Sequence, residues 1–392
     1  MGSKDLVRAK VMEMVVQGHK SLGEAATVLK ISYRQAKRLY RRYREDGERG
    51  LIHRNVGQPS RHRIEEGIHR EAIEVYRRDY PDFGPTFAAE KLAQRHEIVV
   101  DHETLRRWLI AEGLWQTKRN RHAYRQRRRR RERFGELVQF DGSQHEWFEG
   151  RAEGCCLMNM VDDATGRTLS FLCPQETTAA AMWLLWRWIV RYGIPQAVYC
   201  DRKNAFVLDR EPTIAEQLAG IVPKSPFEVA CEKLGIEVIV ARSPQAKGRV
   251  ERNHAVYQDR LVKELRLGGI SDIETANHYL ETEFLQEING KFEKLPAEPE
   301  DAHVPLLGEQ DLRNVLCFEH QRVVSQDFVV QFAARCYQIL TEPRRHRPRP
   351  TAKVTVHRWL DETVHFFWQD RELLVEEIAR PQRKEAAKQL SA

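Results

Sequence analysis

The 392-residue chain lacks the long apolar run that a membrane-spanning helix needs. Its longest uncharged apolar run, Ala179 to Trp186, is far shorter than the ~20 residues required to cross a bilayer. The first residues are not followed by the apolar segment of a secretory signal. These absences exclude a membrane protein of the helical type and predict a cytoplasmic protein.

The sequence also lacks the cysteine patterns of zinc sites and disulfide frameworks. Its seven cysteines are scattered, with no CxxC motif and no histidine at a zinc-finger spacing. We therefore expect buried, reduced thiols. No GxxxxGK motif followed by Ser or Thr is present, so the sequence predicts no ATPase of the P-loop type within the chain.

Positive charge is concentrated in one segment. The chain has 64 Lys and Arg against 57 Asp and Glu, a net charge of +7, and residues 118–133 alone hold ten basic side chains and one acidic one. Such a run favours binding along nucleic-acid phosphates. A solvated linker is the weaker alternative, because clustered guanidiniums repel one another unless anions screen them. The residues expected to contact DNA here are Lys118, Arg119, Arg121, Arg125, Arg127, Arg128, Arg129, Arg130 and Arg131.

The first 50 residues predict a helix-turn-helix. Ser21 stands three residues before Glu24, and Ser32 three before Gln35, which is the spacing of two helix-capping boxes. An ordinary helical hairpin with a solvated basic face is the alternative. The second helix carries side-chain types that contact base edges and phosphates in a major groove: Arg34, Gln35, Lys37, Arg38, Arg41 and Arg42.

A second pattern of this kind follows the polar linker at residues 55–61. One helix is predicted after Gly84, and Asp101 is expected to cap another. Arg106 and Arg107 lie on the outer side of this second helix and are further candidates for DNA contacts. Two such modules before a basic segment predict one extended DNA site.

From residue 136 onward the pattern predicts strands and helices in the order β-β-β-α-β-α-β-α, a mixed sheet with helices as in nuclease-type α/β layers. Strands are expected at 137–148, 157–161, 168–173, 197–200 and 238–241, and helices at 178–192, 227–234 and 247–267. Nearer the C-terminus, alternating segments predict a small antiparallel β-barrel. These segments are 322–330, 337–340, 353–357 and 364–368.

Three acidic residues occupy positions where these elements can converge. Asp141 lies on the first strand, Asp201 ends the fourth, and Glu251 lies near the start of the long helix. Singly, each has an ordinary alternative: a turn residue, a helix cap, or an ion pair with Lys247. Together they would offer the oxygen ligands that Mg²⁺ prefers, and could hold ions about 3.5 to 4 Å apart for in-line phosphoryl displacement.

The segments around these carboxylates resemble a known family. They are Gln139-Phe140-Asp141-Gly142-Ser143, Tyr199-Cys200-Asp201-Arg202-Lys203, and residues 243–252 with the sequence SPQAKGRVER. In this order they resemble the acidic motifs of bacterial insertion-sequence transposases with a retroviral-integrase-type catalytic core, the DDE class, and most closely the ISNCY group. The 49 residues between Asp201 and Glu251 exceed the integrase-type spacing of roughly 35, and predict a surface insertion near residues 207–223.

The resemblance implies an RNase H-like fold and a catalytic, metal-binding triad of Asp141, Asp201 and Glu251 that holds two Mg²⁺ ions, for which Mn²⁺ should substitute. Lys247, Arg249 and Arg252 surround Glu251 and are expected to hold the DNA backbone. The implied partner is double-stranded DNA, both terminal inverted repeats and target DNA. At least a dimer is expected in the synaptic complex, within a bacterial cytoplasm and on the nucleoid when bound to DNA.

The sequence thus predicts a multidomain DNA transposase. It would bind the terminal inverted repeats of an insertion sequence and catalyse Mg²⁺-dependent 3′-end cleavage and strand transfer. The alternative is a catalytically inactive, transposase-derived DNA-binding regulator, which would have no need of three converging carboxylates. The expected parts are helix-turn-helix domains at 1–55 and 62–116, a basic linker at 117–134, an RNase H-like integrase catalytic core at 135–300 and a small β-barrel at 310–380.

Overall fold

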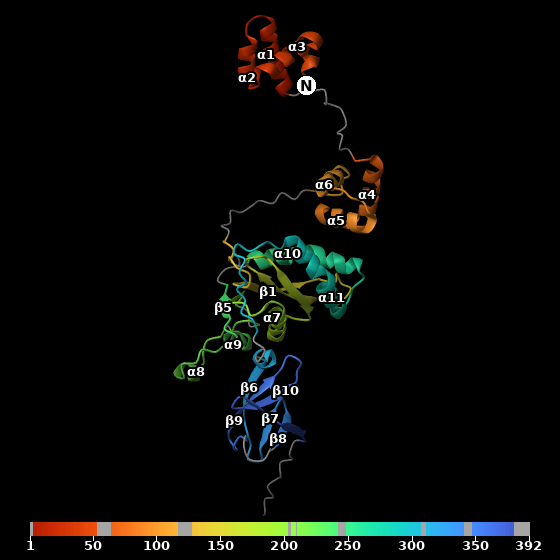
Figure 1. The fold of residues 1–392 in the computed structure, drawn as a ribbon. Helices are drawn as coiled ribbons and strands as arrows, with labels where there is room; N and C mark the ends of the chain where they lie inside the picture. The colour runs from red at the N-terminus through yellow and green to blue at the C-terminus, as the bar shows by residue number, and fades with distance from the viewer. Residues whose placement is uncertain are drawn as a thin grey trace, which may run out of the picture. The chain divides into compact units, whose positions relative to one another are not determined.

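The structure is a computed structural model, and it contains two compact units, residues 1–119 and 120–392 (Figure 1). No helix among its described residues is long and apolar enough to cross a membrane. The described residues are 3–52, 64–116, 128–202, 205–208, 210–241, 248–306, 311–340 and 347–379.

The N-terminal helices begin as the capping pattern predicts. Ser21 forms a full capping box with Glu24, and Ser32 accepts a hydrogen bond from the Gln35 amide (3.2 Å). One helix precedes the predicted pair, and the three pack around an apolar core that includes Met12. The elements are α1 (Ser3–Val16), α2 (Leu22–Leu29), α3 (Tyr33–Asp46) and the 3-10 helix η1 (Gly47–Leu51).

The second helical group contains the predicted pair and one additional helix. Asp101 caps the last helix by accepting hydrogen bonds from two backbone amides, as expected. The additional first helix has Glu65 at its N-cap position without a side-chain capping bond, so it carries no start signal in the sequence. The elements are α4 (Glu66–Asp79), α5 (Pro85–His96) and α6 (His102–Ala111).

A five-stranded mixed sheet forms the centre of the second unit, in the order β3-β2-β1-β4-β5. The first three strands are antiparallel, whereas β1 pairs with β4, and β4 with β5, in parallel. This is the predicted RNase H-like arrangement. The strands are β1 (Val138–His145), β2 (Cys155–Asp162), β3 (Thr168–Cys173), β4 (Ala197–Cys200) and β5 (Glu237–Val240).

Helices pack on both faces of this sheet, and Figure 1 shows α10 and α7 on opposite sides of β1. The short α8 lies inside the insertion expected between the second and third acidic residues. The helices are α7 (Thr178–Tyr192), α8 (Ile214–Leu218), α9 (Pro226–Lys233), α10 (Gly248–Leu267), α11 (Ile273–Tyr279), the π-helix η3 (Leu280–Phe284) and α12 (Leu285–Phe292).

The structure confirms that the cysteines are buried. The apolar stripe of α10, from Val250 to Leu265, is buried, and all seven cysteines are buried free thiols. Of the three tryptophans of α7, Trp188 is fully buried, but Trp183 is 45% exposed. Trp183 therefore lies on the outer side of the helix.

The C-terminal strands differ from the predicted pattern in one place. The strand expected at 322–330 is two strands, because the chain turns at Ser325 and Asp327, and Phe328 adopts a positive φ of 58°. Val324 and Phe328 still pack into the apolar core, so the alternation continues across the turn and hides it. The elements are α13 (Leu312–Val315), β6 (Phe318–Val323), β7 (Val329–Phe332), β8 (Arg335–Ile339), β9 (Lys353–Arg358), β10 (Val364–Trp368), β11 (Arg371–Leu373) and β12 (Val375–Ile378).

These strands form two small sheets, in the orders β11-β10-β9-β6 and β12-β8-β7. The sheets share one apolar core, in which Tyr337 of the smaller sheet contacts Phe366 of the larger one. The β-rich C-terminal domain is therefore as expected. Within the described residues, however, its strands form two hydrogen-bonded sheets in place of one closed barrel.

Candidate active site and nucleic-acid interface

Asp141 faces α10 because β1 and α10 contact each other at matching intervals. Alternate strand residues share a face and advance by about 6.6 Å, whereas every fourth helix residue advances by about 6 Å. The contacts are Val250 N to Gln139 Oε1 (3.2 Å), His254 Nδ1 to Asp141 Oδ2 (4.0 Å) and Gln258 Nε2 to Ser143 Oγ (3.1 Å). Asp141 therefore lies against the first two turns of α10.

Asp201 lies beside Asp141 at the same edge of the sheet. The parallel pairing of β1 with β4 matches Gln139 with Tyr199. Continuing this register by two residues brings Asp141 level with Asp201, the residue that follows β4. Residues at the same level of neighbouring parallel strands point to the same face, so this register predicts both carboxylates on the α10 side of the sheet.

Glu251 belongs to the first turn of α10, between the residues that contact β1. Residues three apart on a helix are neighbours, so Glu251 lies next to His254, which contacts Asp141. The Glu251 side chain is exposed, and no ion pair with another described residue engages it. The structure thus places Asp141 against the start of α10, Glu251 in the first turn of that helix, and Asp201 after the strand that pairs with β1.

The glycine after Asp141 leaves room for a side chain on the opposite face. A Cβ atom at Gly142 would lie 2.6 Å from the side-chain carboxyl carbon of Glu176. Since successive strand residues point to opposite faces, Glu176 lies on the side of the sheet away from Asp141. In the Asp141-Gly142 pair, Asp141 therefore faces the site, and Gly142 allows the Glu176 side chain to lie close to the other face of the sheet.

Buried polar side chains hold α10 on the sheet behind Asp141. Asn159 is the direct partner of Asp141 on β2, so its side chain shares the same face. Asn159 Nδ2 donates to Asn253 Oδ1 (2.7 Å), and Thr168 Oγ1 donates to Asn159 Oδ1 (2.7 Å). One turn further along α10, Tyr257 accepts a hydrogen bond from Ser170 Oγ (2.9 Å). These bonds set the rotation of the helix that carries Glu251.

Asp163, in the turn after β2, connects three parts of the site. Its side chain is fully buried. It pairs with the guanidiniums of Arg128 and Arg249 (3.2 Å to Nε of Arg249), and accepts hydrogen bonds from Gln139 Nε2 (2.8 Å) and the Arg131 amide (2.8 Å). Asp163 therefore joins the basic segment, β1 and the N-terminus of α10.

Positive charge gathers at this point. Burial lowers the pKa of Arg249, and the nearby guanidiniums of Arg128, Arg130 and Arg252 lower it further, against the opposite effect of Asp163. Arg249 is only 15% exposed. Its guanidinium is thus engaged by Asp163, whereas the exposed Arg252 side chain beside Glu251 is accessible to a phosphate.

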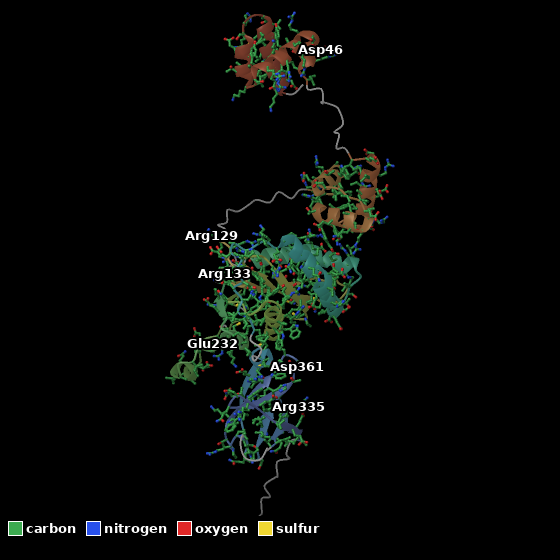
Figure 2. The ribbon with its side chains drawn as sticks, in the orientation of Figure 1. Asp46, Arg129, Arg133, Glu232, Arg335 and Asp361 are labelled. Atoms are coloured by element: carbon green, nitrogen blue, oxygen red, sulfur yellow. The ribbon has the colours of Figure 1, made fainter. Side chains whose placement is uncertain are left out.

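The described end of the basic segment is partly tied to the core. Arg130 donates to the backbone oxygen of Ala164 (2.8 Å), and Arg131 pairs with Glu136 (3.2 Å). Figure 2 labels Arg129 at this edge of the core, and its side chain is exposed. Predicted contacts that lie outside the described residues are Lys118, Arg119, Arg121, Arg125, Arg127 and Lys247.

The exposed side of α3 forms a basic groove in the first unit. Gln35 is exposed beside it, and Arg41 pairs with Glu45 (3.5 Å) at the surface. Arg42 differs from the other predicted contacts, because it donates to the backbone oxygen of Ile52 (2.9 Å) and so holds η1. The basic residues that line the groove are Arg34, Lys37, Arg38, Arg41 and Arg44.

In the second helical group, the two arginines predicted to contact DNA differ in their partners. Arg106 of α6 forms an ion pair with Glu103 (2.6 Å). Arg107 is exposed and donates weakly to Thr104 Oγ1 (3.4 Å). Of the two arginines predicted here, Arg107 is the more accessible to DNA.

Several residues of the site were not identified from the sequence. They are Gln139, Asp163, Asn159, Asn253 and His254. The spacing of Val250, His254 and Gln258, every fourth residue, indicates one helix face, but only the register with β1 shows which strand residues it meets.

Comparisons with known proteins agree with the predicted helix-turn-helix domains and with the family that the sequence resembles. Family models described as "Helix-turn-helix domain" and "Homeodomain-like domain" match residues 7–60 and 35–109. The chain is 36% identical over 385 residues to "Putative transposase y4bF" of Sinorhizobium fredii, an alignment that covers 98% of this chain and 83% of that protein. It is 26% identical over 363 residues to "Transposase for insertion sequence IS1202" of Streptococcus pneumoniae, covering 83% and 76% respectively. Among solved structures, the HTLV-2 integrase catalytic core domain in complex with magnesium (dimeric form) is 18% identical, with a TM-score of 0.30, covering 41% of this chain and 89% of that one.

Proposed function

Because the chain belongs to the insertion-sequence transposases, we propose that it binds the terminal inverted repeats of its element and catalyses metal-dependent 3′-end cleavage and strand transfer into target DNA. The observation that supports this most directly is the placement of Asp141 on β1, of Asp201 after the neighbouring β4 and of Glu251 in the first turn of α10, near a cluster of guanidiniums. A DNA-binding regulator would need the guanidiniums but not the carboxylates.

The three acidic side chains are of the type that binds magnesium. They supply carboxylate oxygens, the hard ligands that Mg²⁺ takes, and contain no cysteine thiol that would favour a softer metal. Asp141, Asp201 and Glu251 would hold two Mg²⁺ ions, with Mn²⁺ as a substitute. When bound, such ions stabilise the charge that develops on the attacking and leaving oxygens of a phosphoryl displacement.

The other residues of the site would position the carboxylates and the DNA. Val250 and Asn253 fix α10 through Gln139 and Asn159, which sets the direction of the Glu251 side chain. Arg252, exposed at the same turn, would contact a phosphate next to the carboxylates. Arg249 would act indirectly, since Asp163 already engages its guanidinium.

DNA binding would be divided among the parts of the chain. Helix α3 would lie in the major groove of the inverted repeat with its basic side toward the DNA, and α6 would add contacts through Arg107. We keep the domain boundaries predicted from the sequence, with helix-turn-helix domains at 1–55 and 62–116, a basic linker at 117–134, a catalytic core at 135–300 and the β-rich domain at 310–380. Since two element ends must be joined to one target, at least a dimer would form in the synaptic complex, in the bacterial cytoplasm.

A cleavage and joining assay tests this function. The purified chain is incubated with duplexes carrying candidate inverted repeats and with Mg²⁺ or Mn²⁺, and nicked and joined strands are separated on denaturing gels. Asp141→Asn should abolish both products and leave binding to the ends unchanged within about twofold, because it removes a metal ligand outside the DNA-reading modules.

Asp259→Asn is the matched control. Asp259 lies on α10, pairs with Lys263 and is 52% exposed, so its substitution changes charge on the same helix without touching Asp141. Cleavage that persists in Asp141→Asn would contradict the metal role. End binding without cleavage by the wild-type chain, with either metal, would favour the regulator.

A further inference from the structure

A second group of metal-binding side-chain types lies in the C-terminal domain, away from the acidic site. Cys317, Glu319 and His357 offer a thiol sulfur, a carboxylate oxygen and an imidazole nitrogen, all within 4.8 Å of one another. Glu319 and His357 are direct partners across β6 and β9, so their side chains share a face. Cys317 is buried, whereas the Glu319 side chain is 29% exposed, which leaves the cluster open to solvent on one side.

Hydrogen bonds around His357 fix which of its ring nitrogens can bind a metal. Trp359 Nε1, which can only donate, lies 3.2 Å from Asn314 Oδ1, so this Asn314 atom is an acceptor. His357 Nδ1 lies 3.3 Å from the same oxygen and must therefore carry the ring proton. In the neutral ring, the form that binds metals, the lone pair is then on Nε2, and this atom faces Glu319 Oε1 at 3.6 Å.

Two acceptor atoms that face each other at this distance need a positive charge beside them. Lys233, at the end of α9, supplies one by forming an ion pair with Glu319. Its side chain is 41% exposed, so it can move into solvent when another cation takes its place.

We propose that Cys317, Glu319 and His357 bind one zinc ion, with water as the fourth ligand. Zinc accepts sulfur, nitrogen and oxygen ligands together, and tetrahedral zinc–ligand lengths place ligand atoms roughly 3.3 to 3.6 Å apart, close to the separation of His357 Nε2 and Glu319 Oε1. Asn314 orients the histidine through its other nitrogen, as outer-shell partners of metal-bound histidines do. A thiol ligand makes magnesium a poor occupant.

This site is separate from the proposed transposition chemistry, and the sequence alone did not indicate it. Cys317 directly precedes β6, His357 lies on β9 of the same sheet, and the two have no zinc-finger spacing. Only the pairing of β6 with β9 brings them together. The zinc ion would link the start of the β-rich domain, through Cys317, to the strand that carries His357.

Cobalt binding tests the proposal on the full-length chain. The protein is dialysed against a chelator under reducing conditions and titrated with Co²⁺, and the thiolate-to-cobalt charge-transfer absorption is recorded. One equivalent of Co²⁺ should produce this band, and one equivalent of Zn²⁺ should remove it. Carboxylates do not produce the band, so the result is independent of Asp141, Asp201 and Glu251 and of the outcome of the cleavage assay.

Variants identify the ligands. Cys317→Ser should lose the band, whereas Cys336→Ser, which changes a buried cysteine of β8, should keep it. Asn314→Ala should weaken cobalt binding by about 10- to 100-fold, because the histidine loses its orienting partner. Lys233→Gln should tighten it severalfold, since the competing cation is removed from the surface without disturbing the core.

The Lys233→Gln result does not depend on the folding of a core variant. An absent band in the wild-type chain would overturn the proposal, as would an undiminished band in Cys317→Ser. Unchanged or weaker cobalt binding by Lys233→Gln would show that no cation competes at Glu319, and would overturn it as well.

Discussion

Gln139 donates a hydrogen bond to Asp163 inside the catalytic core, with 2.8 Å between Nε2 and Oδ1. The other atom of the same amide, Oε1, accepts a hydrogen bond from the Val250 backbone at 3.2 Å. One side chain of β1 therefore connects the turn after β2 with the first turn of α10, next to Glu251. The predictions below begin with this connection.

Substituting Gln139→Ala should destabilise the core and slow the chemistry more than DNA binding. The change leaves the buried Val250 amide and one Asp163 oxygen without this partner, which costs about 1 to 3 kcal/mol in unfolding free energy. Urea unfolding measures the stability, and cleavage at saturating DNA measures the chemistry. Ser143→Ala, on the same strand face, removes one bond to Gln258 and serves as the control. A Gln139→Ala chain as stable as wild type would refute the connection.

Asp163→Ala should be far more damaging than removal of its more exposed partner. Arg249 is 15% exposed and would remain as a largely buried charge. The free energy of unfolding should therefore fall by about 3 to 5 kcal/mol. Arg128 is 39% exposed, so Arg128→Ala should cost about 1 kcal/mol or less. Chemical unfolding of both variants checks this order. Equal losses would mean that Asp163 does not act by neutralising Arg249.

Tyr257 should make stability fall at alkaline pH. Burial raises the pKa of Tyr257 from 10.0 to about 12. The folded state thus holds this proton more tightly than the unfolded state, so its contribution is complete below pH 10.0 and is lost as the pH rises toward about 12.

Unfolding free energies of the wild type and of Tyr257→Phe, measured from pH 9 upward, give the test. At neutral pH the variant should lose about 0.5 to 1.5 kcal/mol with the hydrogen bond from Ser170. Across the alkaline range, the free energy of unfolding of the wild type should then fall by up to about 2 to 3 kcal/mol more than that of the variant. Parallel curves would contradict a raised pKa.

Lys37→Ala should weaken binding to the inverted repeat and reduce its dependence on salt. If Lys37 contacts a phosphate, the slope of log K against log salt concentration should fall in magnitude by about 0.9. Fluorescence anisotropy at several salt concentrations measures it. Arg8→Ala is the control, because Arg8 lies on α1 and pairs with Asp5 (3.3 Å) outside the α3 groove. The same change in slope for both variants would argue for a general charge effect in place of a contact.

Much of the fold could be predicted because its signals are local. Ser21 with Glu24 and Asp101 with its following amides mark helix starts within three residues. The alternating strands of the core were found with errors of a few residues at their ends. The turn at Ser325 to Asp327 was missed, since apolar residues on either side continue the strand pattern and pack into the same core.

The site was predicted less completely than the fold. The three carboxylates stay a prediction that rests on segments resembling family motifs, and for Arg249 and Arg42 the sequence did not indicate their partners within the protein. Both were expected to contact DNA, and the structure gives them partners within the protein, Asp163 and the Ile52 backbone. A basic side chain in the sequence does not reveal whether its counter-charge is a phosphate or a carboxylate.

The sequence by itself determined the order along the chain of the strands in the core sheet, the concentration of positive charge and the three acidic positions. Capping, periodicity and charge act between residues close in the chain and can be recognised there. The tertiary structure alone decided that His254 meets Asp141, that Asp163 engages Arg249 and that His357 lies across from Glu319. Such pairs depend on strand register and on the rotation of a helix against a sheet, which arise only when distant segments pack together.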